Sequence, residues 1–207
     1  MEDLNVLCLK SEEPMLGGLR QPVRLRDASA AASPHWMRCV EEKLTNGSVR
    51  FLARPQLNID RDVCRLVASP HGFPLISHVF KDERRRFVAA IDKTTSDGKR
   101  LLIKAFPLRT LLAQLRWRRY GFREFSHHRE AVCRGIPAAG LYAYFQVTNR
   151  FGLTESCGVL MEHLARHTTL RETLRLETTD RWQALADVAG LLQVCYAKGV
   201  NHIDISV

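Results

Sequence analysis

The sequence of 207 residues lacks any pair of cysteines at C-x-x-C spacing and any run of cysteines and histidines at metal-ligand spacing. Disulfide scaffolds and structural zinc sites need such spacings, so we expect neither in this protein. Reduced thiols in a cytosolic protein are the natural interpretation. The six cysteines are instead scattered along the chain, as Cys8, Cys39, Cys64, Cys133, Cys157 and Cys195.

Long apolar segments are also missing. No run of 18 apolar residues occurs, so we expect no membrane-spanning helix. The charged residues Glu2, Asp3 and Lys10 interrupt the first ten positions, and we therefore expect no signal peptide. Internal repeats and low-complexity tracts are absent as well. A chain of this length can bury one sizeable core, and we predict a cytoplasmic protein.

Positive charge is concentrated in one block of the sequence. The formal net charge is +9, and the segment from Lys81 to Arg123 holds 13 Lys and Arg against 4 Asp and Glu, so the remainder is balanced. Such a block indicates an anionic partner, which could be the phosphates of a nucleotide, a nucleic acid or an acidic membrane surface. A solvated basic face without a partner is the alternative.

The first third of the chain carries few signals. Glycine and proline interrupt residues 1–48, where we expect a loosely attached arm, with a short helix at Trp36–Leu44. Short apolar runs at Val49–Ala53 and Val63–Ala68 resemble strands. We assign residues 1–75 to a poorly defined N-terminal extension without a function.

The rest of the chain predicts an α+β fold with a five-stranded antiparallel sheet and one inserted helical region, residues 108–134. A short helix at 169–176 and a longer one at 180–198 would begin a helical region. The apolar spacing of the longer helix predicts a buried stripe made of Trp182, Leu185, Val188, Ala189, Leu192 and Tyr196. The five predicted strands are Ile76–Phe80, Phe87–Ile91, Leu101–Phe106, Leu141–Val147 and Cys157–Met161.

Lys104 interrupts the most apolar of these strands. A buried ammonium group needs a carboxylate or a phosphate beside it. Glu124 is the expected partner, because it shares one helix face with His128 and Val132, and Glu130 is the fallback. Strand alternation leaves a second interpretation open, in which Lys104 lies on an edge strand and points to water.

The segment Leu108–Arg123 combines leucines at helical spacing with five arginines. This pattern predicts an amphipathic basic helix. Such a helix suits an anionic membrane surface, with arginines at the headgroups and leucines below them. Packing on its own domain with a solvated basic face is the alternative.

Several stretches, taken in order and spacing, resemble the lipopolysaccharide core kinases, which phosphorylate Kdo and heptose sugars and have a protein-kinase-like fold. The resemblance covers about residues 76–207. It implies a kinase-like N-lobe and hinge over 76–164 and the start of a helical C-lobe over 165–207. The stretches are RLLIKAF at 100–106, the basic run to Arg119, REF at 123–125, RGIP at 134–137, GVLMEHL at 158–164 and GVNHID at 199–204.

The resemblance also implies roles for individual residues. Lys104 would hold the nucleotide phosphates and Glu124 would pair with it, while Asp204 would accept the proton of the sugar hydroxyl. Met161 would lie at the back of the adenine pocket, and the backbone from Glu162 to Leu164 would hydrogen-bond the base. The implied cofactors are ATP and magnesium. The implied acceptor is a lipid-linked sugar at the cytoplasmic face of the inner membrane, with peripheral membrane contact and no nucleic acid partner.

Two features depart from the kinase pattern. The residues from Lys81 to Arg86 stand where a glycine-rich phosphate loop is usual. The magnesium-binding Asn and Asp-Phe-Gly that follow the catalytic Asp would lie beyond Val207. We therefore expect a truncated kinase that is inactive alone, or else a non-catalytic kinase-like nucleotide-binding or scaffold protein. A nucleic-acid-binding domain would explain the charge but not Lys104, Glu124 and Asp204.

Overall fold

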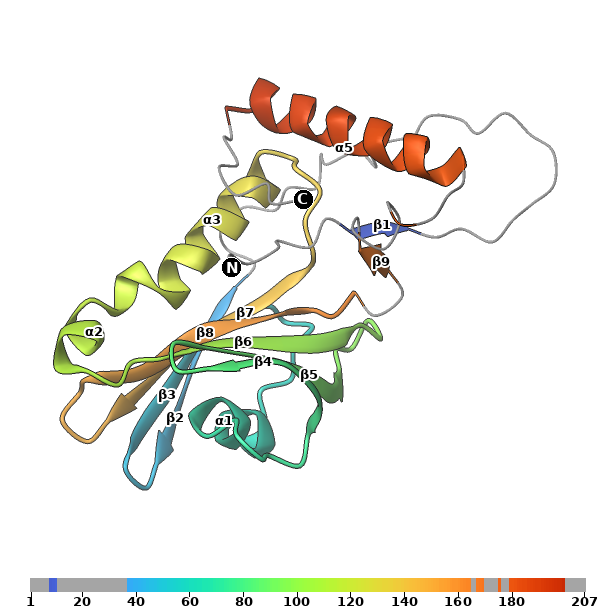
Figure 1. The fold of residues 1–207 in the computed structure, drawn as a ribbon. Helices are drawn as coiled ribbons and strands as arrows, with labels where there is room; N and C mark the ends of the chain where they lie inside the picture. Colours follow the sequence, from blue (N-terminus) through green and yellow to red (C-terminus); the bar gives the residue numbers. More distant parts are fainter. Residues whose placement is uncertain (1–7, 11–36, 165–166, 170–174, 176–178, 200–207) are drawn as a thin grey trace. The chain divides into compact units, whose positions relative to one another are not determined.

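The computed structural model describes residues 8–10, 37–164, 167–169, 175 and 179–199 (Figure 1). The chain divides into two compact units. The larger unit comprises residues 32–132 and 138–163, and the smaller one comprises residues 1–31, 133–137 and 164–207. Within the described ranges, no helix is both long and apolar enough to cross a membrane.

The larger unit is built on one antiparallel sheet of seven strands (Figure 1). The strands lie in the order β2-β3-β7-β8-β6-β5-β4. Their bounds are β2 Arg38–Leu44, β3 Gly47–Ala53, β4 Ile76–Glu83, β5 Arg86–Thr94, β6 Arg100–Pro107, β7 Leu141–Asn149 and β8 Thr154–Glu162.

The prediction of a five-stranded sheet is therefore wrong. The five predicted strands are present as β4 to β8, but β2 and β3 extend the sheet beyond β7. The predicted helix at Trp36–Leu44 is instead strand β2, whose residues Val40 and Leu44 pack on the core at even spacing. Gly47 permits the close approach of β3 to β7, because a Cβ atom there would lie 1.8 Å from the carbonyl oxygen of Thr148.

One face of the sheet is covered by helix α1, Arg61–Ala68 (Figure 1). The strand-like interpretation of Val63–Ala68 is wrong, because the segment is helical. Asp60 caps the helix, since its Oδ1 atom accepts a hydrogen bond from the backbone N–H of Val63 at 2.9 Å. Val63, Leu66 and Val67 stand at helical spacing and are fully buried against the sheet.

The opposite face carries three short helical segments (Figure 1). They are α2 Leu111–Leu115, the 3-10 turn η3 Trp117–Arg119 and α3 Gly121–Cys133, so the predicted continuous helix over Leu108–Arg123 is broken. Phe125 of α3 is buried with Tyr144 and Val159 of the sheet. This second core holds α3 on the sheet.

The smaller unit contains the antiparallel pair β1 Cys8–Lys10 and β9 His167–Thr169, together with helix α5, Thr179–Ala197. Helix α5 is close to the predicted helix over 180–198. Arg134, also in this unit, donates from Nη1 to the carbonyl oxygens of Lys198 at 2.8 Å and Gly199 at 3.1 Å. The short helix predicted at 169–176 lies largely outside the described residues.

Of the predicted buried stripe of α5, Val188 is confirmed as buried, but Trp182, Leu185, Ala189 and Tyr196 are exposed and the prediction is wrong for them. Trp182 is 71% exposed and Tyr196 is 80% exposed, whereas Ala184, Val188 and Cys195 are buried. The buried residues stand four and eleven positions apart and share an arc of about 40° on the helix. The buried arc therefore begins at Val188, at one edge of the predicted stripe, and extends away from it to Cys195 and Ala184.

Candidate functional site

Lys104 lies on β6, an internal strand between β5 and β8. Its neighbours Ile103 and Ala105 are fully buried in the core that includes α1. Strand alternation therefore directs Lys104 to the opposite face, where α3 lies. Its side chain is 14% exposed, so the interpretation of an edge strand with Lys104 in water is wrong.

The ion pair predicted between Lys104 and Glu124 is confirmed. The Nζ atom of Lys104 donates to Oε1 of Glu124 at 2.6 Å. Glu124 lies in the first turn of α3, where a carboxylate also interacts favourably with the helix dipole. The alternative partner, Glu130, lies further along α3 and is exposed. The carboxylate offsets the cost of placing an ammonium group at a largely buried position.

Two glycines bring α3 down onto the sheet. A Cβ atom on Gly121, the first residue of α3, would lie 2.8 Å from the backbone nitrogen of Gly158 in β8. A Cβ atom on Gly158 would lie 2.2 Å from the carbonyl oxygen of Lys104. Glu124 follows one helical turn after Gly121, so this contact sets the distance between the Glu124 side chain and the sheet at Lys104. The sequence analysis missed the pair, although a glycine in a strand often marks a close backbone approach.

His128 follows Glu124 by one turn on the same face of α3. Its Nε2–H group donates to the carbonyl oxygen of Ala139 at 2.6 Å, which ties α3 to the segment before β7. Burial lowers the pKa of His128 below its ordinary value, although the nearby Glu124 carboxylate works in the other direction. Burial thus favours the neutral imidazole, and the hydrogen bond to Ala139 and the Glu124 carboxylate oppose it.

Further basic side chains share the face of Lys104. Val88 of β5 pairs with Lys81 on one side and with Lys104 on the other, so both lysines lie on one face of the sheet. The guanidinium carbon of Arg86 lies 5.6 Å from the centre of the Phe106 ring, and the Nζ atom of Lys104 lies 5.9 Å from it. Two cations, Arg86 and Lys104, therefore lie near the Phe106 ring, and Lys81 lies on the same face of the sheet.

The segment that stands in place of a glycine-rich loop is a closed hairpin. Glu83 pairs with Arg86, which leaves only Arg84 and Arg85 as the turn between β4 and β5. Lys81 also forms an ion pair with Glu83, with 3.1 Å between Nζ and Oε1. A turn of this length has no spare backbone to wrap around a ligand.

The predicted adenine-binding segment ends strand β8. Met161 is half-buried and pairs with Leu102 of β6 and with Leu141 of β7. The side chain of Glu162 contacts Lys99, with 2.9 Å between Oε1 and Nζ, and its Oε2 atom accepts from the backbone N–H of Gly140 at 3.2 Å. Met161 and Glu162 thus lie one strand away from Lys104, on the neighbouring β8.

The backbone of this segment is partly engaged in the sheet. The N–H of Glu162 donates to the carbonyl oxygen of Gly140 at 2.6 Å, and the N–H of His163 donates to that of Arg100 at 2.8 Å. Leu164 follows and is half-buried. Asp204, the predicted catalytic base, lies outside the described residues.

Sequence reasoning also missed an aromatic cluster on β4. Phe80 is 52% exposed, and its ring centre lies 4.6 Å from that of His78 and 5.5 Å from that of His163. An exposed aromatic ring beside the predicted adenine-binding segment has no counterpart in the sequence analysis, because strand alternation alone does not show which neighbours a ring will meet.

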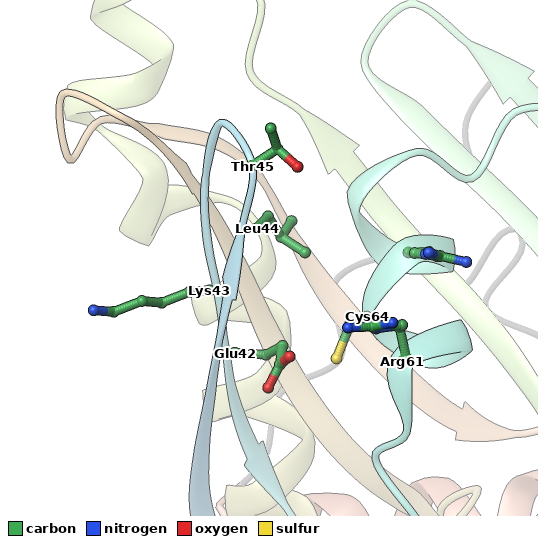
Figure 2. Close-up of a pocket in the computed structure, with 7 residues that line it drawn as sticks. Glu42, Lys43, Leu44, Thr45, Arg61 and Cys64 are labelled. Atoms are coloured by element: carbon green, nitrogen blue, oxygen red, sulfur yellow. The ribbon is translucent and has the colours of Figure 1, made fainter.

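A separate pocket of about 210 Å³ lies between β2 and α1. Figure 2 shows Cys64 of α1 pointing toward the strand, where Glu42 faces it, while Lys43 points away. Burial raises the pKa of the Cys64 thiol to about 11, and the Glu42 carboxylate adds to this effect. Such a thiol is a poor nucleophile at neutral pH, and we assign no function to this pocket.

Across the described ranges, no three His, Cys, Asp or Glu side chains gather into a group that could hold a metal ion. Comparison of the chain with protein-family models, with curated proteins and with solved structures finds no match. The resemblance to lipopolysaccharide core kinases therefore rests on the residues of this chain alone.

Proposed function

We propose that this protein binds ATP through Lys104 and transfers its terminal phosphoryl group to a sugar hydroxyl of the lipopolysaccharide inner core. The observation that carries the proposal is the ion pair between Lys104 and Glu124, at 2.6 Å on an internal strand. In kinases a strand lysine that contacts the nucleotide phosphates is held by a helix glutamate in this way. The sugar acceptor, Kdo or heptose, comes from the resemblance.

The chemistry of the pair suits a phosphate ligand. An ammonium group has three N–H donors. Glu124 fixes the position of Nζ with one of them, which leaves donors for phosphate oxygens. Because the side chain of Lys104 is only 14% exposed, its attraction to a phosphate is weakly screened by solvent. A positioned cation of this kind stabilises the charge on a transferring phosphoryl group.

Side chains take the place of a phosphate-binding loop in this proposal. The two-residue turn at Arg84–Arg85 cannot surround a triphosphate with backbone N–H groups. Lys81 and Arg86, on the same face as Lys104, would supply the positive charge instead. Arginine is well suited to this, since its planar guanidinium group binds phosphate oxygens in pairs.

The proposed reaction needs a proton acceptor as well as a phosphate site. Asp204 would accept the proton of the sugar hydroxyl. The hydroxyl oxygen would form a bond to the terminal phosphorus of ATP, and the bond between that phosphorus and ADP would break. Magnesium, when bound with the nucleotide, neutralises charge on the phosphates. No ligand group for it forms in the described part of the chain, so magnesium enters through the resemblance alone.

The acceptor sets the proposed location. A lipid-linked core sugar is presented at the cytoplasmic face of the inner membrane, so the protein would work there as a peripheral protein. The basic block from Lys81 to Arg123 agrees with an anionic surface of this kind.

A second candidate function is that of a non-catalytic kinase-like scaffold. It is favoured by the backbone of the predicted adenine-binding segment, where the N–H groups of Glu162 and His163 are already engaged by Gly140 and Arg100. An engaged N–H group has no hydrogen left to donate to a base. In this case the Lys104–Glu124 pair would only hold α3 on the sheet.

Titration calorimetry with ATP separates the two. We expect Lys104→Met to weaken ATP binding by about ten- to a hundredfold, the value of a hydrogen bond to a charged group. Lys43→Met, an exposed lysine of β2, is the control and should bind like the wild type. Wild-type protein that binds no ATP, or a Lys104→Met variant that binds equally well, contradicts the proposal. If ATP binds through Lys104 but no phosphate reaches a core acceptor, the protein binds nucleotides without catalysis.

A further inference from the structure

Helix α2 presents three large leucines to solvent. Leu111, Leu112 and Leu115 are 59%, 66% and 62% exposed, and no residue of this helix is buried. They occupy an arc of about 100° on the helix. The other side of α2 faces the domain, since Ala113 packs on the core beneath α3 and the Nε2 group of Gln114 donates to the carbonyl oxygen of Leu108 at 3.1 Å.

The helix is fixed in this orientation at both ends. Before it, Leu108 is buried, and the hydroxyl of Thr110 accepts from the backbone N–H of Ala113 at 3.3 Å. After it, Trp117 stacks near Tyr144 of the sheet, with 6.4 Å between ring centres. The leucines therefore face outward because the flanking residues are anchored. A contiguous apolar surface of this kind usually marks a binding surface.

Five arginines adjoin the leucines in the sequence. Arg109, Arg116, Arg118, Arg119 and Arg123 are all exposed. No aspartate or glutamate occurs between Gly98 and Arg123. None of the five arginines forms an ion pair with a carboxylate among the residues that the structure describes. Their charge is thus available to an anionic partner.

We propose that α2 and the adjoining arginines form a membrane-docking surface that binds an anionic lipid bilayer. Leu111, Leu112 and Leu115 would enter the acyl region, while the arginines bind lipid phosphates. An anionic bilayer accommodates exposed apolar side chains that are flanked by arginines, because it offers acyl chains directly beneath its negative headgroups. The proposal rests on the peripheral location given under the proposed function and deepens it by naming the surface that makes the contact. It needs neither the nucleotide site nor catalysis, so a vesicle experiment tests it separately from ATP binding.

Charge decides between a bilayer and a second copy of the chain. Two copies that met through these leucines would bring their arginine clusters together, and like charges at close range repel. An anionic lipid surface removes the repulsion and supplies a counterion for each arginine. Only the leucines would enter the bilayer, so the rest of the larger unit would stay in water.

Co-sedimentation of the 207-residue protein with lipid vesicles tests the proposal. The probes are vesicles of phosphatidylcholine alone and of phosphatidylcholine with phosphatidylglycerol at about seven to three, at low salt. We expect binding to the anionic vesicles only. The combined variant Leu111→Ser, Leu112→Ser and Leu115→Ser should bind them at least about tenfold more weakly. The combined variant Arg116→Gln, Arg118→Gln and Arg119→Gln should bind the anionic vesicles much more weakly, and any remaining binding should depend less on the salt concentration.

The matched control is Phe151→Ser, which removes an apolar side chain that is 71% exposed on the turn between β7 and β8. We expect it to bind vesicles like the wild type. Because the three leucines are exposed, their serine variant should fold normally, as circular dichroism would show. Equal vesicle binding by the leucine variant and the wild type overturns the proposal. So does light scattering that shows a dimer for the wild type and a monomer for the leucine variant, without a change in vesicle binding.

Discussion

Gly121 at the start of α3 rests directly on Gly158 of β8, so closely that a Cβ atom on Gly121 would lie 2.8 Å from the backbone nitrogen of Gly158. Real Cβ atoms do not come this near to a backbone atom. The contact fixes the first turn of α3 on the sheet, and Glu124 in that turn reaches Lys104 as a result. Two residues without side chains thus set the geometry of the candidate site.

The substitution Gly121→Ala tests this relationship. The added methyl group would push α3 away from β8, and we expect a loss of about 1–3 kcal/mol in the free energy of unfolding together with weaker ATP binding. Urea denaturation and titration calorimetry measure the two effects.

The control for this experiment is Gly190→Ala in α5, where an added Cβ atom meets no other atom within 4 Å. Alanine should stabilise that helix by about 0.5–1 kcal/mol. A Gly121→Ala protein as stable as the wild type would show that α3 adjusts freely, and that the glycine contact does not position Glu124.

His128 should make the stability of the protein depend on pH. Its pKa in the folded protein is lowered by burial from the ordinary value of 6.5, so the unfolded chain binds a proton more readily. Stability from this group is complete above about pH 6.5 and is lost as the pH falls through the lower folded pKa. We expect urea unfolding of the wild type to need less urea at pH 5.5 than at pH 7.5.

The variant His128→Gln should show less of this pH dependence, since an amide group can still donate to Ala139 but does not titrate in this range. His127→Gln, an exposed neighbour on the same helix, is the control and should keep it. Identical pH profiles for wild type and His128→Gln would mean that other groups cause the effect.

Alkylation should separate the cysteines into two classes. Burial raises the pKa of Cys64 and of Cys157 to about 11, so each thiol stays protonated at pH 8. Cys39 and Cys133 are exposed. In folded protein, iodoacetamide should therefore modify Cys39 and Cys133 within minutes and leave Cys64 and Cys157 intact until urea is added. Mass spectrometry of the digested protein measures the alkylation of each cysteine. Modification of Cys64 at the same rate as Cys39 would contradict the burial of Cys64 between α1 and the sheet.

Local pattern in the sequence was sufficient for part of the fold. Apolar runs predicted the strands β4 to β8. Edge strand β2 was missed, because only Val40 and Leu44 of its side chains contact the core and the others are exposed. Helix α1 was missed because a buried run of valine and leucine suits either a strand or a helix, and the cap at Asp60 was overlooked.

The sequence by itself predicted that Lys104, if buried, needs a carboxylate or a phosphate beside it, and helical spacing favoured Glu124 over Glu130 as the carboxylate. Only the tertiary structure placed Lys104 on an internal strand, which excluded the alternative of a lysine in water. Tertiary structure alone decided how the two meet, through the Gly121–Gly158 contact between segments far apart in the chain. It also decided which way the leucines of α2 face. An apolar stripe beside arginines fits a protein core or a membrane equally well, and only the anchoring of Leu108 and Trp117 in the core turns Leu111, Leu112 and Leu115 toward solvent.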